Sequence, residues 1–196
     1  MLAGRGIDFH TLAIVWKPCC PITRFRLMLS ITRCFMLVKL ILQGITMITV
    51  EKSDPFSSES CRLIELLSAE LAAITGDNGK SNFTVDAMSD DKALWALAKN
   101  SQGNAIGCGA IRPLTQNIAE LKRMFSDRSV PGVGCALLKF LEKSAKEMGY
   151  TELRLETRHI NYRAVNFYKK NGYIRIANYG PYIGRTEAVC FSKALR

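Results

Sequence analysis

The chain has 196 residues, of which 48% are hydrophobic and 9% aromatic, a composition typical of a globular protein that is long enough for one well-buried domain. We find no internal repeat and no low-complexity tract. The formal net charge of +10 suggests acidic partners, but residues 1–46 supply half of it with six Lys and Arg against one Asp, so a nucleic-acid partner is not required.

Residues 1–46 differ from the rest of the chain. Arg33 and Lys39 interrupt their apolar run "TRFRLMLSITRCFMLVKLILQGITM", so no stretch reaches the ~18–20 apolar residues that cross a bilayer. No small-x-small cleavage site follows, as a signal peptide would require. A basic amphipathic surface helix stays open as an alternative. We favour a single domain over residues 47–196, preceded by a non-native or disordered leader over residues 1–46.

From Met47 onward the sequence alternates between strand and helix patterns. The predicted elements, in chain order, are a strand (47–52), a helix (59–75), three strands (92–100, 105–114 and 118–125), a helix ended by Gly149, a strand (151–157), a short helix (161–172) and two strands (173–179 and 187–195). Short turn-rich joints favour an antiparallel meander among the first strands. The later strand–helix–strand run is a βαβ pattern, so we expect its two strands to be parallel. The fold class is α/β, with a mixed α+β sheet.

Apolar residues at helical spacing predict which helix faces are buried. In the first helix this stripe consists of Leu63, Leu66, Leu67, Leu71 and Ile74. In the second it consists of Leu137, Leu138, Leu141, Ala145 and Met148. Asn161 is placed to cap the short helix and Gly172 to end it.

The seven cysteines form an odd set with no Cys-x-x-Cys pair and no histidine at ligand spacing. This pattern disfavours both a disulfide framework and a zinc site, and it favours a reducing cytoplasm. We therefore expect single thiols and no metal.

The segment "SVPGVGCALLKFLEK" at 129–143 places two glycines at the start of a helix. Gly132 and Gly134 let the backbone turn sharply and let a large group approach its amides. The first N–H groups of a helix lack partners and lie at the positive end of its dipole, which suits a phosphate. Taken alone, a glycine pair before a helix also fits a simple tight turn.

Three segments together resemble one family. "AELKRMFSDRSVPGVGCALLKFLEKSAKEMGY" resembles the acetyl-CoA motif of the GNAT family of N-acetyltransferases, which is a strand, a Gln/Arg-x-x-Gly-x-Gly/Ala turn and a helix. "NYRAVNFYKKNGY" resembles the next motif of that family, and "GNAIGCGAIRPL" is similar to the strand before the cofactor strand. The resemblance spans about residues 47–196. It implies a GNAT-like fold, an antiparallel meander followed by a βαβ crossover at the acetyl-CoA site.

The activity that the resemblance implies is transfer of an acetyl group from acetyl-CoA to a primary amine of a small molecule, amino acid or peptide. A non-catalytic acyl-CoA-binding sensor or interaction domain is the alternative. A basic binder of nucleic acid or membrane surfaces would rest on the charge of residues 1–46, but no nucleic-acid motif supports it. We expect no nucleic-acid partner and no membrane. The oligomeric state stays open, with a homodimer among the alternatives.

In this family, backbone N–H groups of the glycine turn wrap the pyrophosphate of the cofactor, and the cofactor strand offers backbone groups to the pantetheine arm. The cofactor-binding positions that the resemblance implies are Met124, Phe125, Ser126, Val130, Gly132, Val133, Gly134, Cys135, Ala136, Asn161 and Tyr168. The turn departs from the motif at its first position, where Ser129 stands in place of Gln or Arg, and the loop is about two residues shorter. Arg128 is the nearest replacement charge.

Two residues match catalytic positions of the family. Tyr168 matches a tyrosine that acts as general acid toward the leaving thiolate, although it also fits plain core packing. Glu120 matches a glutamate that acts as base in part of the family, and Lys122, two residues along on the same strand face, offers an ion pair instead. Weaker candidates for holding an acceptor carboxylate are Arg112, Arg158 and Tyr182.

Overall fold

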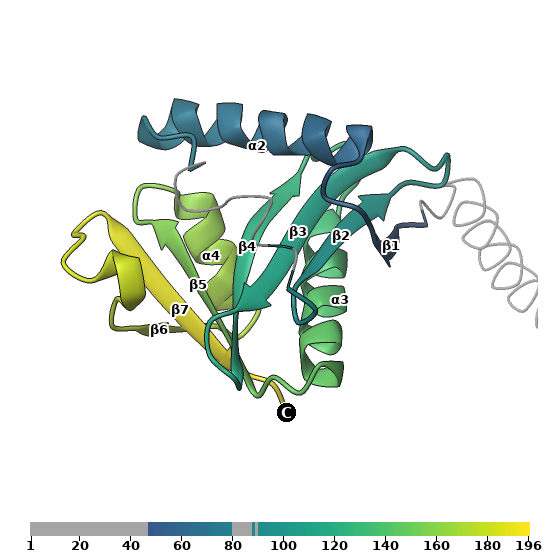
Figure 1. Cartoon of the computed structure of the whole chain (residues 1–196). Helices are drawn as coiled ribbons and strands as arrows, with labels where there is room; N and C mark the ends of the chain where they lie inside the picture. Colours follow the sequence, from purple (N-terminus) through teal and green to yellow (C-terminus); the bar gives the residue numbers. More distant parts are fainter. Residues whose placement is uncertain (1–46, 80–87, 89) are drawn as a thin grey trace, which may run out of the picture. The chain divides into compact units, whose positions relative to one another are not determined.

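Seven strands form one mixed sheet in the order β1-β2-β3-β4-β5-β7-β6 (Figure 1). The computed structural model describes residues 47–79, 88 and 90–196; residues 1–46, to which the leader prediction applies, lie outside the described residues. The strands are β1 (Thr49–Lys52), β2 (Leu94–Lys99), β3 (Ala105–Pro113), β4 (Ile118–Ser126), β5 (Glu152–Arg158), β6 (Ile174–Ile176) and β7 (Ala188–Ala194). The helices are α2 (Ser58–Thr75), α3 (Val133–Glu147) and α4 (Tyr162–Lys170), with a short 3₁₀ turn η3 (Gly180–Tyr182).

The strand directions confirm the predicted fold class. Strands β1 to β4 pair antiparallel as a meander, and β4 and β5, which flank α3, pair in parallel. Strands β6 and β7 pair antiparallel as expected, but β7 also inserts beside β5, and that neighbour was not predicted. The η3 turn between them was also missed, because a single 3₁₀ turn has no periodicity to detect.

The helices cover the two faces of the sheet. Leu63 and Leu67 of α2 pack with Trp95, Leu97 and neighbouring residues on one face. On the other face, α3 and α4 pack on a larger cluster that contains most of the core. The predicted stripe of α2 was wrong at Leu66, which is 44% exposed. The buried stripe runs instead through Ser60, Leu63, Ile64, Leu67 and Ser68.

Two glycines in β3 leave room for side chains of α3 and β4 to pack closely against this strand. A Cβ at Gly107 would lie 2.6 Å from Val133 Cγ1, and one at Gly109 would lie 2.6 Å from Met124 Sδ. Real Cβ atoms do not tolerate such distances. A side chain at Gly107 would also meet the backbone oxygen of Phe125 at 2.8 Å, whereas one at Gly109 would displace the side chains of Met124 and Leu141. The glycines therefore fix the position of the helix that begins at the glycine turn.

The predicted helix ends are confirmed. Asn161 Oδ1 accepts the N–H of Ala164 at 3.2 Å as the cap of α4. Gly149 and Gly172 follow α3 and α4 with φ values of +90° and +83°, a left-handed conformation that favours glycine.

Within the described part, no helix has the length and apolar character needed to cross a membrane. The cysteines described there, Cys61, Cys108, Cys135 and Cys190, are all free thiols.

Candidate active site

The parallel strands β4 and β5 are paired only over their first residues. Their register ends at Glu120 opposite Arg154. Beyond that point the strands separate toward α2 (Figure 1). A pocket of about 290 Å³ opens there, lined by residues 121–126 of β4 and 156–158 of β5, together with parts of α2, α3 and α4. Because β5 does not pair with this part of β4, the edge at Met124–Ser126 has no strand partner among the described residues and can bind an extended ligand.

A bulge in β4 directs two consecutive basic side chains toward the α2 face. The register with β3 shifts between Cys108 and Ala110, and Arg123 opposite this shift has φ +52°. The guanidinium of Arg123 donates to the carbonyl oxygens of Asn78 at 3.5 Å and Gly79 at 3.1 Å, which tie the segment after α2 to β4. Lys122, the preceding residue, faces the pocket. The bulge thus holds one basic side chain as a structural tie and leaves the other at the cavity.

The glycine turn leads directly into α3. Gly132 is the N-cap, with φ +92° and no side chain to cap the helix, and the first helical bond joins the N–H of Ala136 to its carbonyl oxygen at 2.9 Å. The amides of Val133, Gly134 and Cys135 therefore precede the intrahelical ladder. The pocket reaches this helix start at Gly134.

The predicted cofactor positions fall into two groups in the structure. The first group lines the pocket: Met124, Phe125, Ser126, Gly134, Asn161 and Tyr168. The second group does not line it and lies along the turn and the first turn of the helix: Val130, Gly132, Val133, Cys135 and Ala136. The side chain of Val133 is buried in the core, so only its backbone is available to a ligand.

Ser129 does not replace the charge expected at the start of the turn. Its N–H and hydroxyl both donate to Asp127 Oδ1, at 2.9 and 2.7 Å, which keeps it within the loop. Arg128 lines the pocket with φ +65° and pairs with Glu70 of α2 at 2.9 Å. Arg163 of α4 approaches the same carboxylate at 3.3 Å. The carboxylate of Glu70 therefore links α2 to α4 and to the loop after β4.

Tyr168 is packed in the core and also lines the pocket. It is 7% exposed and packs edge-on against Tyr173 and Phe167, yet it also lines the pocket. Burial raises the pKa of its phenol above the ordinary value of 10.0, so the hydroxyl stays protonated at neutral pH. Among the described residues, no group hydrogen-bonds to this hydroxyl.

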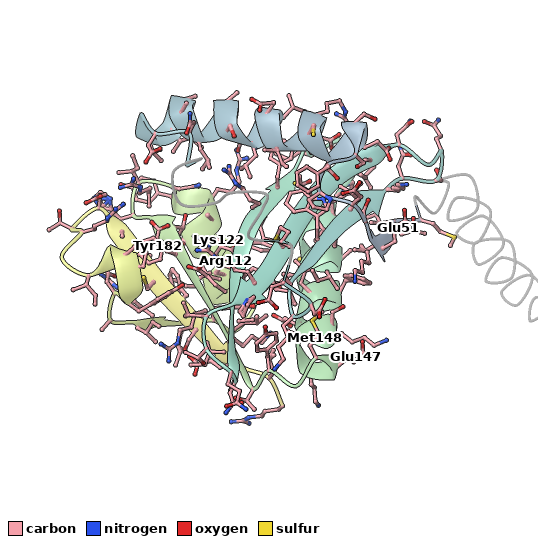
Figure 2. All side chains as sticks on the ribbon, viewed as in Figure 1. Glu51, Arg112, Lys122, Glu147, Met148 and Tyr182 are labelled. Atoms are coloured by element: carbon pink, nitrogen blue, oxygen red, sulfur yellow. The ribbon has the colours of Figure 1, made fainter. Side chains whose placement is uncertain are left out.

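Glu120 lies at the centre of a buried charged cluster rather than on the pocket wall. Its Oε2 accepts from Nε and an Nη of Arg112 at 3.0 and 2.8 Å, and its Oε1 accepts from the hydroxyls of Tyr179 and Tyr182 at 2.9 and 3.1 Å. Lys122 Nζ lies 3.4 Å from the same Oε1, the ion pair that the sequence offered as an alternative. Figure 2 shows Arg112, Lys122 and Tyr182 gathered on one face of the sheet.

The charges in this cluster determine its protonation. Burial alone would raise the pKa of Glu120, but Lys122 and Arg112 outweigh it and hold that pKa below the ordinary 4.5. Burial lowers the pKa of Lys122, against the opposing effect of Glu120. Glu120 is therefore ionised, with both oxygens engaged.

Arg112, Arg158 and Tyr182, the candidates for binding an acceptor carboxylate, are engaged within the protein. Arg158 pairs with Glu187 at 2.6 Å and with Asp77 at 2.9 Å. The other two bind Glu120. His159 is exposed. In the described ranges, no group of three His, Cys, Asp or Glu residues is arranged to hold a metal ion.

A sequence profile of the Acetyltransferase (GNAT) family matches residues 62–173, which is more than half of the chain. The chain belongs to this family. The GNAT resemblance of the glycine turn and the α4 motif is confirmed, and the protein is an acyltransferase.

Relatives agree with this assignment. An "IAA acetyltransferase" of Azospirillum brasilense is 28% identical over 138 residues, covering 69% of this chain and 90% of that protein. The solved structure of an acyl-CoA N-acyltransferase from Klebsiella pneumoniae is 28% identical, with a TM-score of 0.65 over 76% of this chain and 99% of that one. A GNAT acetyltransferase of Elizabethkingia anophelis, solved with acetyl-CoA bound, shares the fold at 18% identity, with a TM-score of 0.56 over 76% of this chain and 98% of that one.

The sequence analysis assigned none of the three acidic residues that line this GNAT pocket to the site: Glu70, Asp77 and Glu156 on β5. The signal was present in "TELRLET", because Leu153 and Leu155 are buried in the core and the alternation turns Glu156 to the opposite face. Periodicity does not indicate that β4 and β5 separate beyond Glu120 and Arg154, so it could not reveal that Glu156 faces a cavity.

Proposed function

We propose that this acyltransferase moves the acetyl group of acetyl-CoA to the primary amine of a small molecule, amino acid or peptide. The observation that carries the proposal is one continuous pocket between the diverging β4 and β5. It runs from the first turn of α3, at Gly134, to the charged side chains of Lys122 and Glu156. The acetyl-CoA held by the Elizabethkingia relative and the acetyltransferase names of the other relatives support the same donor.

The residues that fit the donor are those at the α3 end. Amides from Val133 to Cys135 and the dipole of α3 suit a pyrophosphate, and no side chain at Gly132 or Gly134 stands in its way. The unpaired edge of β4 at Met124–Ser126 suits the amide groups of a pantetheine arm. Asn161 also lines the pocket, and its side chain caps the first turn of α4.

Tyr168 is suited to act as the general acid. Acetyl-CoA supplies an activated thioester, whose sulfur leaves as a thiolate unless it receives a proton. A phenol with a raised pKa is protonated at neutral pH and has a hydrogen to donate. Its hydroxyl has no partner among the described residues, so nothing described competes for that hydrogen.

Glu120 as the general base stays a prediction. Its position favours a different role, because both carboxylate oxygens already accept hydrogen bonds and its lowered pKa makes it a weak proton acceptor. In this arrangement it pairs with Lys122, which lines the pocket, and accepts hydrogen bonds from Tyr179 and Tyr182.

A thiol-release assay with acetyl-CoA and a panel of amines tests the proposal. The panel should contain spermidine, free lysine, a simple alkylamine and peptides with free N-termini. The expected result is thiol release that depends on at least one amine and yields the acetylated amine by mass spectrometry. Tight acetyl-CoA binding with no turnover of any amine would favour the sensor alternative and overturn the proposal.

A further inference from the structure

Lys122 is the one amine among the described residues that line the pocket. Its side chain is 10% exposed, and it lies beside Arg112 and Tyr182 (Figure 2). The other described side chains there that could attack a thioester are hydroxyls, which are weak nucleophiles unless a base activates them. Once it loses its proton, Lys122 is therefore the strongest nucleophile of the described pocket.

The partners of Lys122 leave one of its N–H groups for the cavity. A lysine ammonium has three hydrogens. One is donated to the hydroxyl of Tyr182, and Glu120 Oε1 lies 3.4 Å from Nζ. The two oxygens of Glu120 already accept four hydrogen bonds, from Arg112, Tyr179 and Tyr182. When the third hydrogen of Lys122 is lost, the lone pair takes its place while the two contacts remain.

The charges around Lys122 favour loss of this proton. Burial lowers the pKa of Lys122, and the guanidinium of Arg112 adds to the effect, while the carboxylates of Glu120 and Glu156 oppose it. Glu120 is shared between the two cations, so it compensates only part of their charge. A lysine that is desolvated beside another cation is a typical activated amine nucleophile.

Lys122 lies where the acyl end of the donor is expected. In the proposed function the pyrophosphate binds at the start of α3, and the pantetheine arm follows the β4 edge at Met124–Ser126. Because β4 runs toward that helix, the arm extends backward along the strand, and the thioester comes to the residues before Met124. Lys122 is two positions before this edge and lines the same cavity. The amine and the activated acetyl group therefore meet at the charged end of the pocket, which Lys122 and Glu156 line.

We propose that Lys122 takes the acetyl group itself when no acceptor amine occupies the pocket, and that the acetylated side chain closes the charged end to acceptors. The inference rests on the donor half of the proposed function, acetyl-CoA, and not on any particular acceptor. Acetylation turns the ammonium into a longer, neutral amide, which gives up the charge paired with Glu120 and fills space in the cavity. An enzyme that holds donor without acceptor thereby becomes inactive.

The step is balanced in atoms and electrons. Nζ gives one proton to water, and the neutral nitrogen forms a C–N bond to the acetyl carbonyl carbon. The C–S bond breaks, and its electron pair goes to sulfur, which takes a proton from water. The nitrogen then loses its second proton to water. The products are acetylated Lys122, the free thiol of coenzyme A and one proton.

The test follows a labelled acetyl group on the full chain in the absence of any amine. The protein is incubated with acetyl-CoA that carries a heavy-isotope acetyl group, and mass spectrometry measures the label at each lysine. Lys143, which is 77% exposed on α3 and does not line the pocket, measures uncatalysed acetylation in the same sample. Label should appear at Lys122 at least ~10-fold faster than at Lys143, because the bound thioester is held beside it. Acetyl phosphate, which lacks the parts of the donor that the pocket binds, should show no such preference.

Loss of turnover is the second readout. After incubation with acetyl-CoA alone, wild type is assayed with the best amine of the panel, and its activity should fall in proportion to the fraction of acetylated Lys122. Lys122→Arg keeps a cation near Glu120 but cannot take the acetyl group, so whatever activity it has should not decline during the incubation. Lys143→Arg, the matched control, should decline as wild type does.

Each outcome decides something different. Turnover of an amine with no preference for label at Lys122 over Lys143 would overturn the inference and leave the proposed function standing. Preferred labelling of Lys122 without loss of turnover would overturn the closure of the pocket. Preferred labelling of Lys122 in a protein that turns over no amine would support the inference and contradict the proposed function. Neither label at Lys122 nor turnover of any amine would overturn both.

Discussion

The two ends of the pocket are built differently. The α3 end consists of backbone groups from one continuous segment, where the glycine turn runs into the helix. The other end is lined by the charged side chains of Lys122 and Glu156. Behind it, Lys122 pairs with the buried Glu120, which is bonded to a tyrosine 62 positions away. Backbone amides can bind a phosphate whatever the side chains of most residues are. At the charged end, by contrast, the arrangement of charges depends on the identity of each side chain. The difference suggests that substitutions at the α3 end will change donor affinity, and substitutions at the charged end will change turnover or stability.

The largest expected effect is on turnover and comes from Tyr168, which lines the pocket. Tyr168→Phe removes one hydroxyl and keeps the ring that packs against Tyr173. If the hydroxyl protonates the leaving thiolate, kcat should fall by ~10²–10⁴-fold while KM for acetyl-CoA stays nearly constant. Steady-state kinetics measure both. Tyr173→Phe, which removes a buried hydroxyl outside the pocket, is the control. A Tyr168→Phe enzyme with kcat within a few-fold of wild type would reduce Tyr168 to a packing residue.

The second effect tests whether the charged cluster is structural. Glu120→Gln leaves Lys122 and Arg112 without their counter-ion in a site where Glu120 is 1% exposed. Removing one partner of a buried ion pair typically costs about 3–5 kcal/mol of unfolding free energy. Denaturant unfolding measures this loss. Glu152→Gln, which breaks the pair with Arg154 between side chains that are 27% and 29% exposed, should lose less than about 1 kcal/mol.

The same variant gives a pH signature. The pKa of Glu120 is lower in the folded protein than its ordinary 4.5, so its stabilising contribution is present above that pH. The contribution is lost as pH falls through the folded-state pKa. The stability difference between wild type and Glu120→Gln should therefore shrink in acid. A difference that is independent of pH would contradict the role of the charge. A Glu120→Gln enzyme that folds normally and loses only turnover would instead favour the prediction that Glu120 is the base.

The third effect concerns the glycine turn. Gly132 and Gly149, at opposite ends of α3, have nearly the same backbone conformation, with φ of +92° and +90°. A substituted side chain at either costs ~1–2 kcal/mol of stability through left-handed strain. Gly132→Val should in addition weaken acetyl-CoA binding at least tenfold, because the turn presents its amides to the pyrophosphate. Calorimetry and thermal unfolding separate the two losses. Equal acetyl-CoA affinity in Gly132→Val and Gly149→Val would contradict the phosphate assignment.

The smallest expected effect is on acetyl-CoA affinity and comes from Glu70. Glu70 neutralises Arg128 and Arg163, which both line the pocket. Glu70→Gln should free these guanidiniums for phosphate and tighten acetyl-CoA binding by a few-fold, with a steeper loss in salt. Titrations at two salt concentrations measure it. The control is Glu147→Gln at the far end of α3 (Figure 2), and an unchanged salt dependence in Glu70→Gln would show that the arginines do not reach the donor.

The sequence by itself determined the order of the elements and the donor end of the pocket. Periodicity gave the strands and helices, and glycine, capping and motif spacing located the turn before α3 and the cap at Asn161. These features are local, since each depends on residues a few positions apart. Local patterns of this kind can be recognised in a single amino-acid sequence. The error at Leu66 lay in choosing which part of an apolar helix faces the sheet.

Only the tertiary structure decided the charged end. The insertion of β7 beside β5 carries η3 to Glu120, and the separation of β4 from β5 opens the space that Glu156 faces. Both depend on segments that are far apart in the chain, as Glu120 and Tyr182 are at 62 positions, and their charged side chains look like ordinary surface charges in the sequence. A carboxylate can have several partners, as Glu120 has, or none among the described residues, as is the case for Glu156, and which of the two applies follows from the neighbours that the fold brings to it. Strand periodicity puts both on one face of the sheet and cannot distinguish them.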